Sequence, residues 1–87
     1  MFPKSIHSER GWLIAKRIAE LRSQKGFTQR DLARLLSREH GLVGRIETCE
    51  RRVELVELIQ IFTAMGCDVE NEITRLVTDL LKIPASE

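Results

Sequence analysis

The sequence predicts an all-α protein of five short helices in a single domain that spans residues 1–87. Apolar residues recur at helical spacing, and no segment alternates apolar and polar residues for long enough to form a strand. Glycine, proline and capping residues separate the helical segments at short intervals. A chain of 87 residues can bury one hydrophobic core but not two. We expect a core of four helices over residues 8–66 and a C-terminal helix over residues 68–82 that is a candidate for dimerisation.

The first helix is expected between Ser8 and Gly26. Ile14, Ile18 and Leu21 follow one another at intervals of four and three residues, which places them on one helical face. Ser8 or a neighbour is the expected N-cap, and Gly26 lies just beyond the expected last turn.

A short second helix is expected over residues 28–36. Thr28 supplies an N-cap hydroxyl, and Asp31 follows three residues later, as in a capping box with Asp in place of the usual Glu or Gln. The apolar residues of this helix are Leu32, Ala33, Leu35 and Leu36.

A third helix is expected over residues 39–47, after a tight turn at residues 37–41. Val43 and Ile46 are three residues apart and would bury one of its faces. Glu39 would lie at its first turn, where the helix dipole favours an anion. Residues 48–52 are expected to form a loop.

The last two helices are expected on either side of Gly66, which suits a left-handed C-cap. The apolar residues of the fourth helix are Leu55, Leu58, Ile59 and Phe62. Asp68 can cap the fifth helix, and Pro84 stops it. The apolar stripe of the fifth helix consists of Val69, Ile73, Leu76, Val77, Leu80 and Leu81.

Charge is distributed unevenly along the chain, although its net value is only +1. Residues 1–52 hold twelve Lys or Arg and six Asp or Glu, whereas residues 53–87 hold two and seven. A basic front and an acidic back allow one face to approach a polyanion. The sequence has no apolar run of the roughly 18 residues needed to span a bilayer. We expect a cytoplasmic protein with no membrane partner.

Several other classes of function are disfavoured by the sequence. Cys49 and Cys67 are far apart and form no C-x-x-C pair, so we expect reduced thiols and no zinc site. No triad order, glycine-rich phosphate loop or paired-carboxylate motif is present. We therefore expect no catalytic residue, no metal and no cofactor.

Two short helices joined by a tight turn can place the second in the major groove of DNA, which is about 12 Å wide, while the first crosses the backbone. The apolar positions over residues 28–47 would pack these helices together, and Ala33 supplies the small residue needed where they approach. A G-x-T-Q-x-x-L-A string begins at Gly26, and a V-G-R-I-E string begins at Val43. With residues 18–25 and 50–52, these strings resemble the phage repressor/Cro (XRE-type) helix-turn-helix family. The similarity covers about residues 12–68.

The resemblance implies a compact five-helix, lambda-repressor-like DNA-binding domain with a helix-turn-helix. By family analogy, Gln29 contacts a phosphate and braces His40, the first residue of the recognition helix. The resemblance also implies a buried ion pair between Arg22 and Glu47. The expected DNA-binding residues are Thr28, Gln29, Arg30, Arg34, Arg38, Glu39, His40, Gly41, Gly44, Arg45, Arg51 and Arg52.

Three departures affect how DNA would be read. Ser37 occupies a turn position where the family usually has glycine, so a strained left-handed backbone is expected there. Gly41 and Gly44 would lie inside the recognition helix and offer no side chain to a base, which leaves Arg45 and His40 as readers. Three explanations stay open: the glycines allow unusually close approach to DNA, specificity is modest, or the surface binds another protein.

Affinity from one short helix is low, so we expect a homodimer on two half-sites about one DNA turn apart. The C-terminal stripe either completes the core or pairs with the same helix of a second subunit, and Val56 is a further candidate for the interface. Trp12 is placed before the first helix and is expected to pack on the protein's own core.

Together these features predict a sequence-specific regulator of transcription that binds duplex DNA as a homodimer, a repressor of phage, plasmid or toxin–antitoxin type. The alternative is a protein-interaction module, an antirepressor or adaptor, that keeps the fold but has weak DNA readout.

Overall fold

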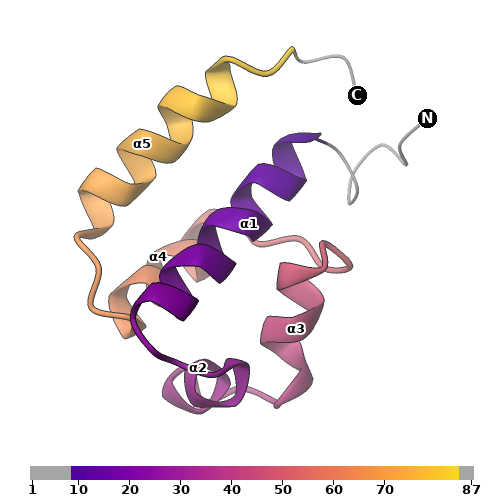
Figure 1. The fold of residues 1–87 in the computed structure, drawn as a ribbon, viewed down its shortest axis with the longest axis vertical. Coiled ribbons are helices and arrows are strands. Elements are labelled where there is room, and N and C mark those ends of the chain that lie inside the picture. The colour runs from indigo at the N-terminus through magenta and orange to yellow at the C-terminus, as the bar shows by residue number, and fades with distance from the viewer. Residues whose placement is uncertain (1–8, 85–87) are drawn as a thin grey trace.

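A computed structural model describes residues 9–84 and places five α-helices around one hydrophobic core (Figure 1). The helices are α1 (Glu9–Gln24), α2 (Gln29–Leu35), α3 (Gly41–Glu47), α4 (Leu55–Ala64) and α5 (Val69–Leu81). Over residues 9–84 no strand is present, as the sequence predicts. The expected N-cap of the first helix, Ser8, lies outside the described residues.

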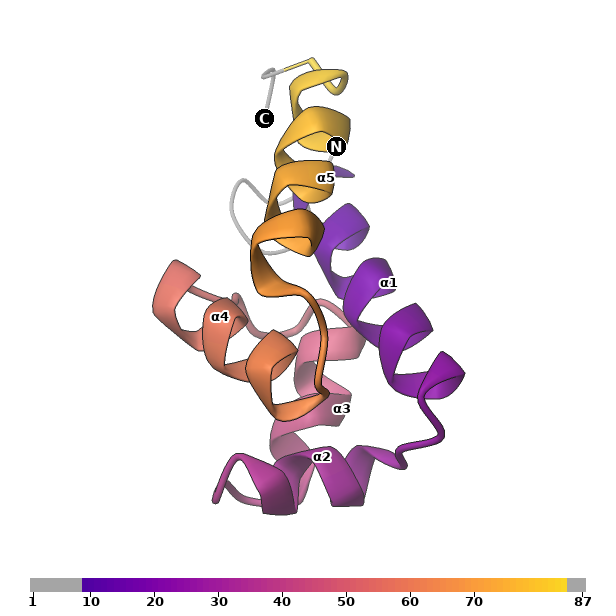
Figure 2. The same ribbon diagram turned by 90° about the vertical axis from the view of Figure 1, so that its left-hand side faces the viewer.

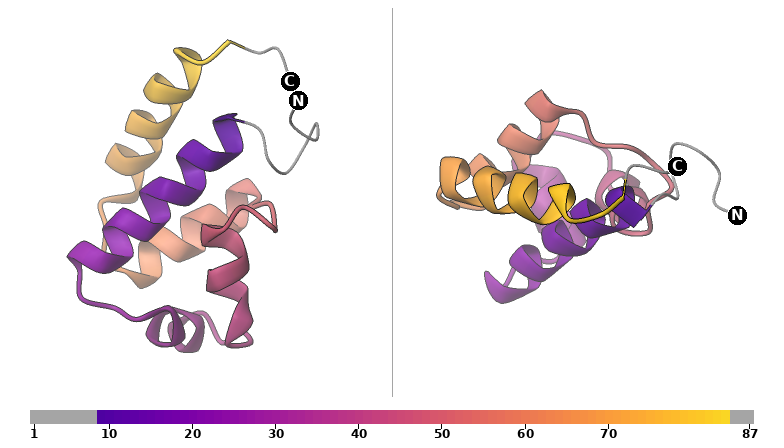
Figure 3. Two further views of the ribbon diagram at one scale, coloured as in Figure 1. Left: turned by 45° about the vertical axis from the view of Figure 1, so that its right-hand side comes forward. Right: turned by 90° about the horizontal axis from the view of Figure 1, so that it is seen from above.

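An ion pair and a hydrogen bond hold α5 antiparallel to α1. Arg17 Nη2 lies 2.9 Å from Glu72 Oε1, and Arg10 Nη2 donates to the carbonyl oxygen of Ile83 at 2.9 Å. Figure 2 shows α2 at the end of the molecule opposite the last turn of α5, and the left view of Figure 3 shows α3 beside it. The two helices expected to form the DNA-reading unit therefore lie together at one end.

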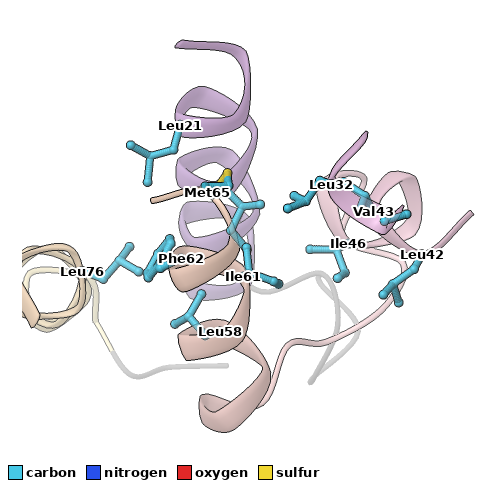
Figure 4. Close-up of a cluster of buried hydrophobic side chains, with 12 residues drawn as sticks. Leu21, Leu32, Leu42, Val43, Ile46, Leu58, Ile61, Phe62, Met65 and Leu76 are labelled. Carbon is cyan, nitrogen blue, oxygen red and sulfur yellow. The ribbon is translucent and has the colours of Figure 1, made fainter. Parts of the chain in front are cut away.

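The core is centred on α4, which supplies its largest fully buried side chain. Phe62 and Ile61 are both 0% exposed, and Figure 4 shows Leu76 of α5 beside Phe62. Leu42 of α3 is also 0% exposed. Neither Leu42 nor Ile61 was among the residues expected to be buried, whereas Val43 and Ile46 are buried as predicted. Ile59, expected on the apolar face of α4, is 39% exposed.

Four of the helices end in the same hydrogen-bonded turn, in which a residue with positive φ follows the C-cap. After α2, for example, the Ser37 N–H donates to Arg34 O and the Arg38 N–H donates to Ala33 O. The positive-φ residues are Gly26 (φ +79), Ser37 (φ +56), Cys49 (φ +61) and Gly66 (φ +74). The left-handed backbone expected at Ser37 is therefore confirmed.

One helix boundary and the position of Trp12 differ from the prediction. The third helix begins at Gly41 rather than at Glu39. The left-handed residue Ser37 ends the turn after α2, and the residues that follow it connect this turn to α3. Trp12 lies inside α1 rather than before it, and its 41% exposure contradicts the expected burial. No helix within residues 9–84 combines the length and the apolar character needed to cross a membrane.

Candidate nucleic-acid interface

The packing of α2 against α3 fixes the helix-turn-helix unit. Leu32 and Ala33 of α2 are 0% exposed, and Val43 and Ile46 of α3 are 1% exposed. The small Ala33 side chain lets the two helices approach closely, as expected. Because both helices bury these residues against each other and the core, their remaining faces point to solvent.

A capping box fixes the beginning of α2. Thr28 Oγ1 accepts from the Asp31 N–H at 3.0 Å, and the Thr28 N–H donates to Asp31 Oδ2 at 2.9 Å. The hydrogen bond from Thr28 N–H is the main reason that the pKa of the Asp31 carboxyl is lowered. The predicted capping box is therefore confirmed, and the Thr28 hydroxyl serves as the cap.

The outward face of α3 carries a single long side chain. Because residues 42, 43 and 46 are buried, this face consists of residues 41, 44 and 45 and continues to the C-cap Thr48. Thr48 Oγ1 donates to Gly44 O at 2.9 Å, which holds its side chain against the helix. Arg45 is therefore the main contact group that α3 offers to a ligand.

Arg45 folds back along α3 and meets Glu39. Arg45 Nη2 donates to Glu39 Oε1 at 2.5 Å, and both side chains are exposed. The guanidinium passes over Gly41: a Cβ atom there would lie 2.8 Å from Arg45 Nη1. Gly41 is the first residue of α3, so only Gly44 lies in its interior, contrary to the prediction of two interior glycines.

A hydrogen-bonded network braces α3 from the side of α1 and α2. Arg22 Nε and Nη2 donate to Glu47 Oε2 and Oε1 at 2.6 and 3.1 Å, and this bonding raises the pKa of Arg22. Gln29 Nε2 donates to Glu47 Oε1 at 3.0 Å. A Cβ atom at Gly44 would lie 3.3 Å from Gln29 Oε1, so this glycine leaves room for the Gln29 amide.

This network confirms the expected pair of Arg22 and Glu47 and corrects the role expected of Gln29. The Gln29 side chain braces Glu47, not His40. The polar neighbour of His40 is Arg30, whose Nη2 lies 3.5 Å from His40 Nδ1. His40 is the N-cap residue of α3 and is exposed, as its expected role requires.

In a comparison with protein families, one family model matches the helix-turn-helix unit together with most of the rest of the chain. The family model described as "Helix-turn-helix domain" matches residues 13–76, which include all of α2, α3 and α4. The chain belongs to this helix-turn-helix domain family.

A solved structure with the same fold is a point mutant of the restriction-modification controller protein C.Esp1396I, described from crystals. It is 23% identical in sequence, with a TM-score of 0.75, and the alignment covers 88% of this chain and 100% of that one. A search of curated proteins finds no significant match. The five-helix arrangement of this helix-turn-helix protein is therefore shared with a known structure.

A buried carboxylate that the sequence interpretation missed holds two of the expected DNA-binding arginines. Glu57 is 7% exposed and lies in the first turn of α4. Arg51 Nη1 and Nη2 donate to Glu57 Oε1 and Oε2 at 2.7 and 3.0 Å, and Arg38 Nη1 donates to Oε2 at 3.2 Å. These bonds, led by that from Arg51, lower the pKa of Glu57 despite its burial. Glu57 thus ties the turn before α3 and the loop after it to α4.

A signal for this cluster is present in the sequence. Glu57 lies four residues before Ile61, on the side of α4 that faces the core, where a carboxylate needs a cationic partner. Arg34 has looser surroundings than these two arginines. Arg34 is 75% exposed in its side chain and lies 3.5 Å from Asp31 Oδ1, and Arg52 is exposed beside Arg51.

Proposed function

We propose that this helix-turn-helix protein binds duplex DNA as a homodimer and represses transcription by occupying its site. The observation that carries the proposal is the outward face of α3, on which Arg45 is the long side chain and behind which Arg22, Gln29 and Glu47 form a brace. A braced helix of this size fits the major groove. Membership of the helix-turn-helix family supports the same function.

Cationic side chains on both sides of α3 would contact the DNA backbone. Arg30 and Arg34 are one helical turn apart on α2 and are exposed, and Arg30 adjoins His40 at the beginning of α3. On the other side, Arg51 and Arg38 line a shallow hollow with Arg52. Glu54 and Glu57 also line this hollow, so its three arginines exceed its two glutamates by one charge.

The homodimer is supported by apolar side chains that the fold leaves exposed. On α5, Leu76 is buried, but Val77 is 48% exposed and Leu81 is 74% exposed. The stripe of α5 therefore completes the core with one part and leaves another part for a second subunit. Leu55 and Val56 at the beginning of α4 are 62% and 61% exposed and form a second candidate surface.

Selection of bound fragments from random duplexes tests this function. We expect enrichment of two symmetric half-sites spaced by about one helical turn, roughly 10 base pairs. Arg45→Ala should remove the enriched sequence, whereas Arg75→Ala, which changes an exposed arginine on α5, should select the same sequence as the native protein. No enrichment by the native protein would contradict sequence-specific binding.

The local packing of the two glycines of α3 favours DNA binding over the alternative of a protein-interaction module. This alternative rested on the two glycines of α3, and both leave room for neighbouring side chains of the unit itself, Arg45 over Gly41 and Gln29 beside Gly44. The Arg45→Ala variant separates the two functions, because binding of a protein partner elsewhere would survive it.

A further inference from the structure

We propose that Glu39 is a specificity-determining residue that holds Arg45 in position to read a guanine. The inference rests on the proposed binding of duplex DNA. Glu39 lies just before α3, and its carboxylate accepts a hydrogen bond from Arg45 Nη2. Glu39 and Arg45 are six residues apart, so the Arg45 side chain crosses the outward face of the first turn of α3 to reach Glu39.

The backbone leaves this path open for the guanidinium. A side chain on a helix leans toward the turn that precedes it, which directs Arg45 over residue 41. The Gly41 Cβ position is only 2.8 Å from Arg45 Nη1, so any larger residue would displace the guanidinium. Gly41 and Glu39 together therefore define one orientation of Arg45.

The remaining donors of Arg45 suit a guanine. A guanidinium has five N–H donors in a fixed plane, and the contact with Glu39 uses one of them. Two parallel donors are enough for the N7 and O6 acceptors of guanine in the major groove. A carboxylate on one edge keeps the guanidinium plane from turning toward other acceptors.

The negative charge of Glu39 also disfavours contacts of Arg45 with phosphate in place of guanine. The Glu39 side chain is 64% exposed at a surface proposed to face phosphates, where a carboxylate is repelled. This repulsion lowers the affinity for DNA in general. The Glu39 carboxylate also competes with phosphate for Arg45 where phosphate is the only DNA acceptor in reach. Glu39 therefore lowers non-specific binding while it favours one base, as expected for a residue that provides specificity.

The inference is tested by fluorescence titration of Glu39→Gln against two duplexes. One is the selected duplex, and in the other the guanine proposed to be read by Arg45 is replaced by adenine. We expect discrimination between the two duplexes to fall by about tenfold, within the range that a bidentate base contact supplies. Affinity for a random duplex should rise. Glu9→Gln removes the same charge from an exposed glutamate in the first turn of α1 and should retain the discrimination.

Gly41→Ala provides a second test that separates positioning from folding. The methyl group displaces the flexible end of Arg45, while alanine favours the helix, so thermal stability should be kept and discrimination should fall. Unchanged discrimination in Glu39→Gln would overturn the inference and leave the proposed function intact. Failure of the native protein to bind any duplex at low salt would overturn both.

Discussion

Arg22 and Glu47 fasten the end of α1 to the last turn of α3 through two hydrogen bonds of 2.6 and 3.1 Å. Arg22 Nη1 also donates to Phe27 O at 2.8 Å, so the same guanidinium holds the turn that leads into α2. The side chains are 18% and 8% exposed. The Arg22 guanidinium therefore joins α1 both to the helix proposed to read DNA and to the turn before α2.

Arg22→Ala should lower the free energy of unfolding by about 3 kcal/mol, because it leaves the mostly buried Glu47 carboxylate without its cation. Urea unfolding followed by circular dichroism measures this change. Arg34→Ala is the matched control: its pair with Asp31 is exposed, and its loss should cost less than about 1 kcal/mol. Equal effects from the two variants would contradict a structural role for the Arg22 pair.

Stability should fall in acid because of Glu57. Its pKa is lowered in the folded protein by Arg51 and Arg38, whereas the pKa of an unfolded glutamate is about 4.3. The stabilisation is therefore fully present above that unfolded value and is lost as the pH falls through the lower folded value. Glu57→Gln should be less stable than the native protein at neutral pH, and the difference should shrink in acid. Urea unfolding at a series of pH values measures it, and a difference that stays constant with pH would contradict this role.

Ser37→Gly should stabilise the protein. Ser37 is exposed and has φ +56, a region that costs a residue with a Cβ about 1 kcal/mol or more, part of which is offset by the flexibility of glycine when unfolded. We expect a net gain of about 0.5–1 kcal/mol in the free energy of unfolding. Gly26→Ser makes the reverse change at φ +79, where a Cβ meets no atom within 4 Å, and should destabilise. A loss of stability in Ser37→Gly would show that the Ser37 side chain has a stabilising role.

The exposed apolar residues of α5 should control assembly. Val77→Asp with Leu81→Asp should yield a folded monomer, because both side chains are exposed in the single chain and a charge there disfavours only a partner. Sedimentation equilibrium measures the change. Arg75→Asp introduces the same side chain at an exposed position on another face of the helix and should leave the dimer intact. A dimer that survives the double substitution but not Val56→Asp would move the interface to α4.

Local signals in the sequence account for most of the fold. The capping box at Thr28, the positive-φ residues Gly26 and Gly66 and the cap at Asp68 fix where helices begin and end, and all are found in the structure. The predicted beginning of α3 is two residues early, because helical propensity does not show that the chain after the left-handed residue Ser37 stays outside a helix until Gly41.

The site was harder to predict because its contacts join separate elements. The partner of Gln29 is eighteen residues away, and Glu57 meets arginines from two different loops. Helical spacing indicates that Glu57 needs a cationic partner, but it does not identify which arginines supply it. The spaces beside Gly41 and Gly44 depend on where Arg45 and Gln29 come to lie. A glycine in a sequence shows that a side chain is missing, but not what fills the space.

The proposed binding of duplex DNA by α3 depends on Arg45 and on the surrounding arginines. Fluorescence anisotropy of a labelled duplex, titrated with the native protein at several salt concentrations, measures this dependence. Affinity should fall by several-fold or more between about 50 and 200 mM salt, as counterions return to the phosphates, and Arg45→Ala should weaken binding to the selected duplex by about 1–3 kcal/mol. Binding that is absent at low salt, or that does not change with salt and with Arg45→Ala, would contradict the claim.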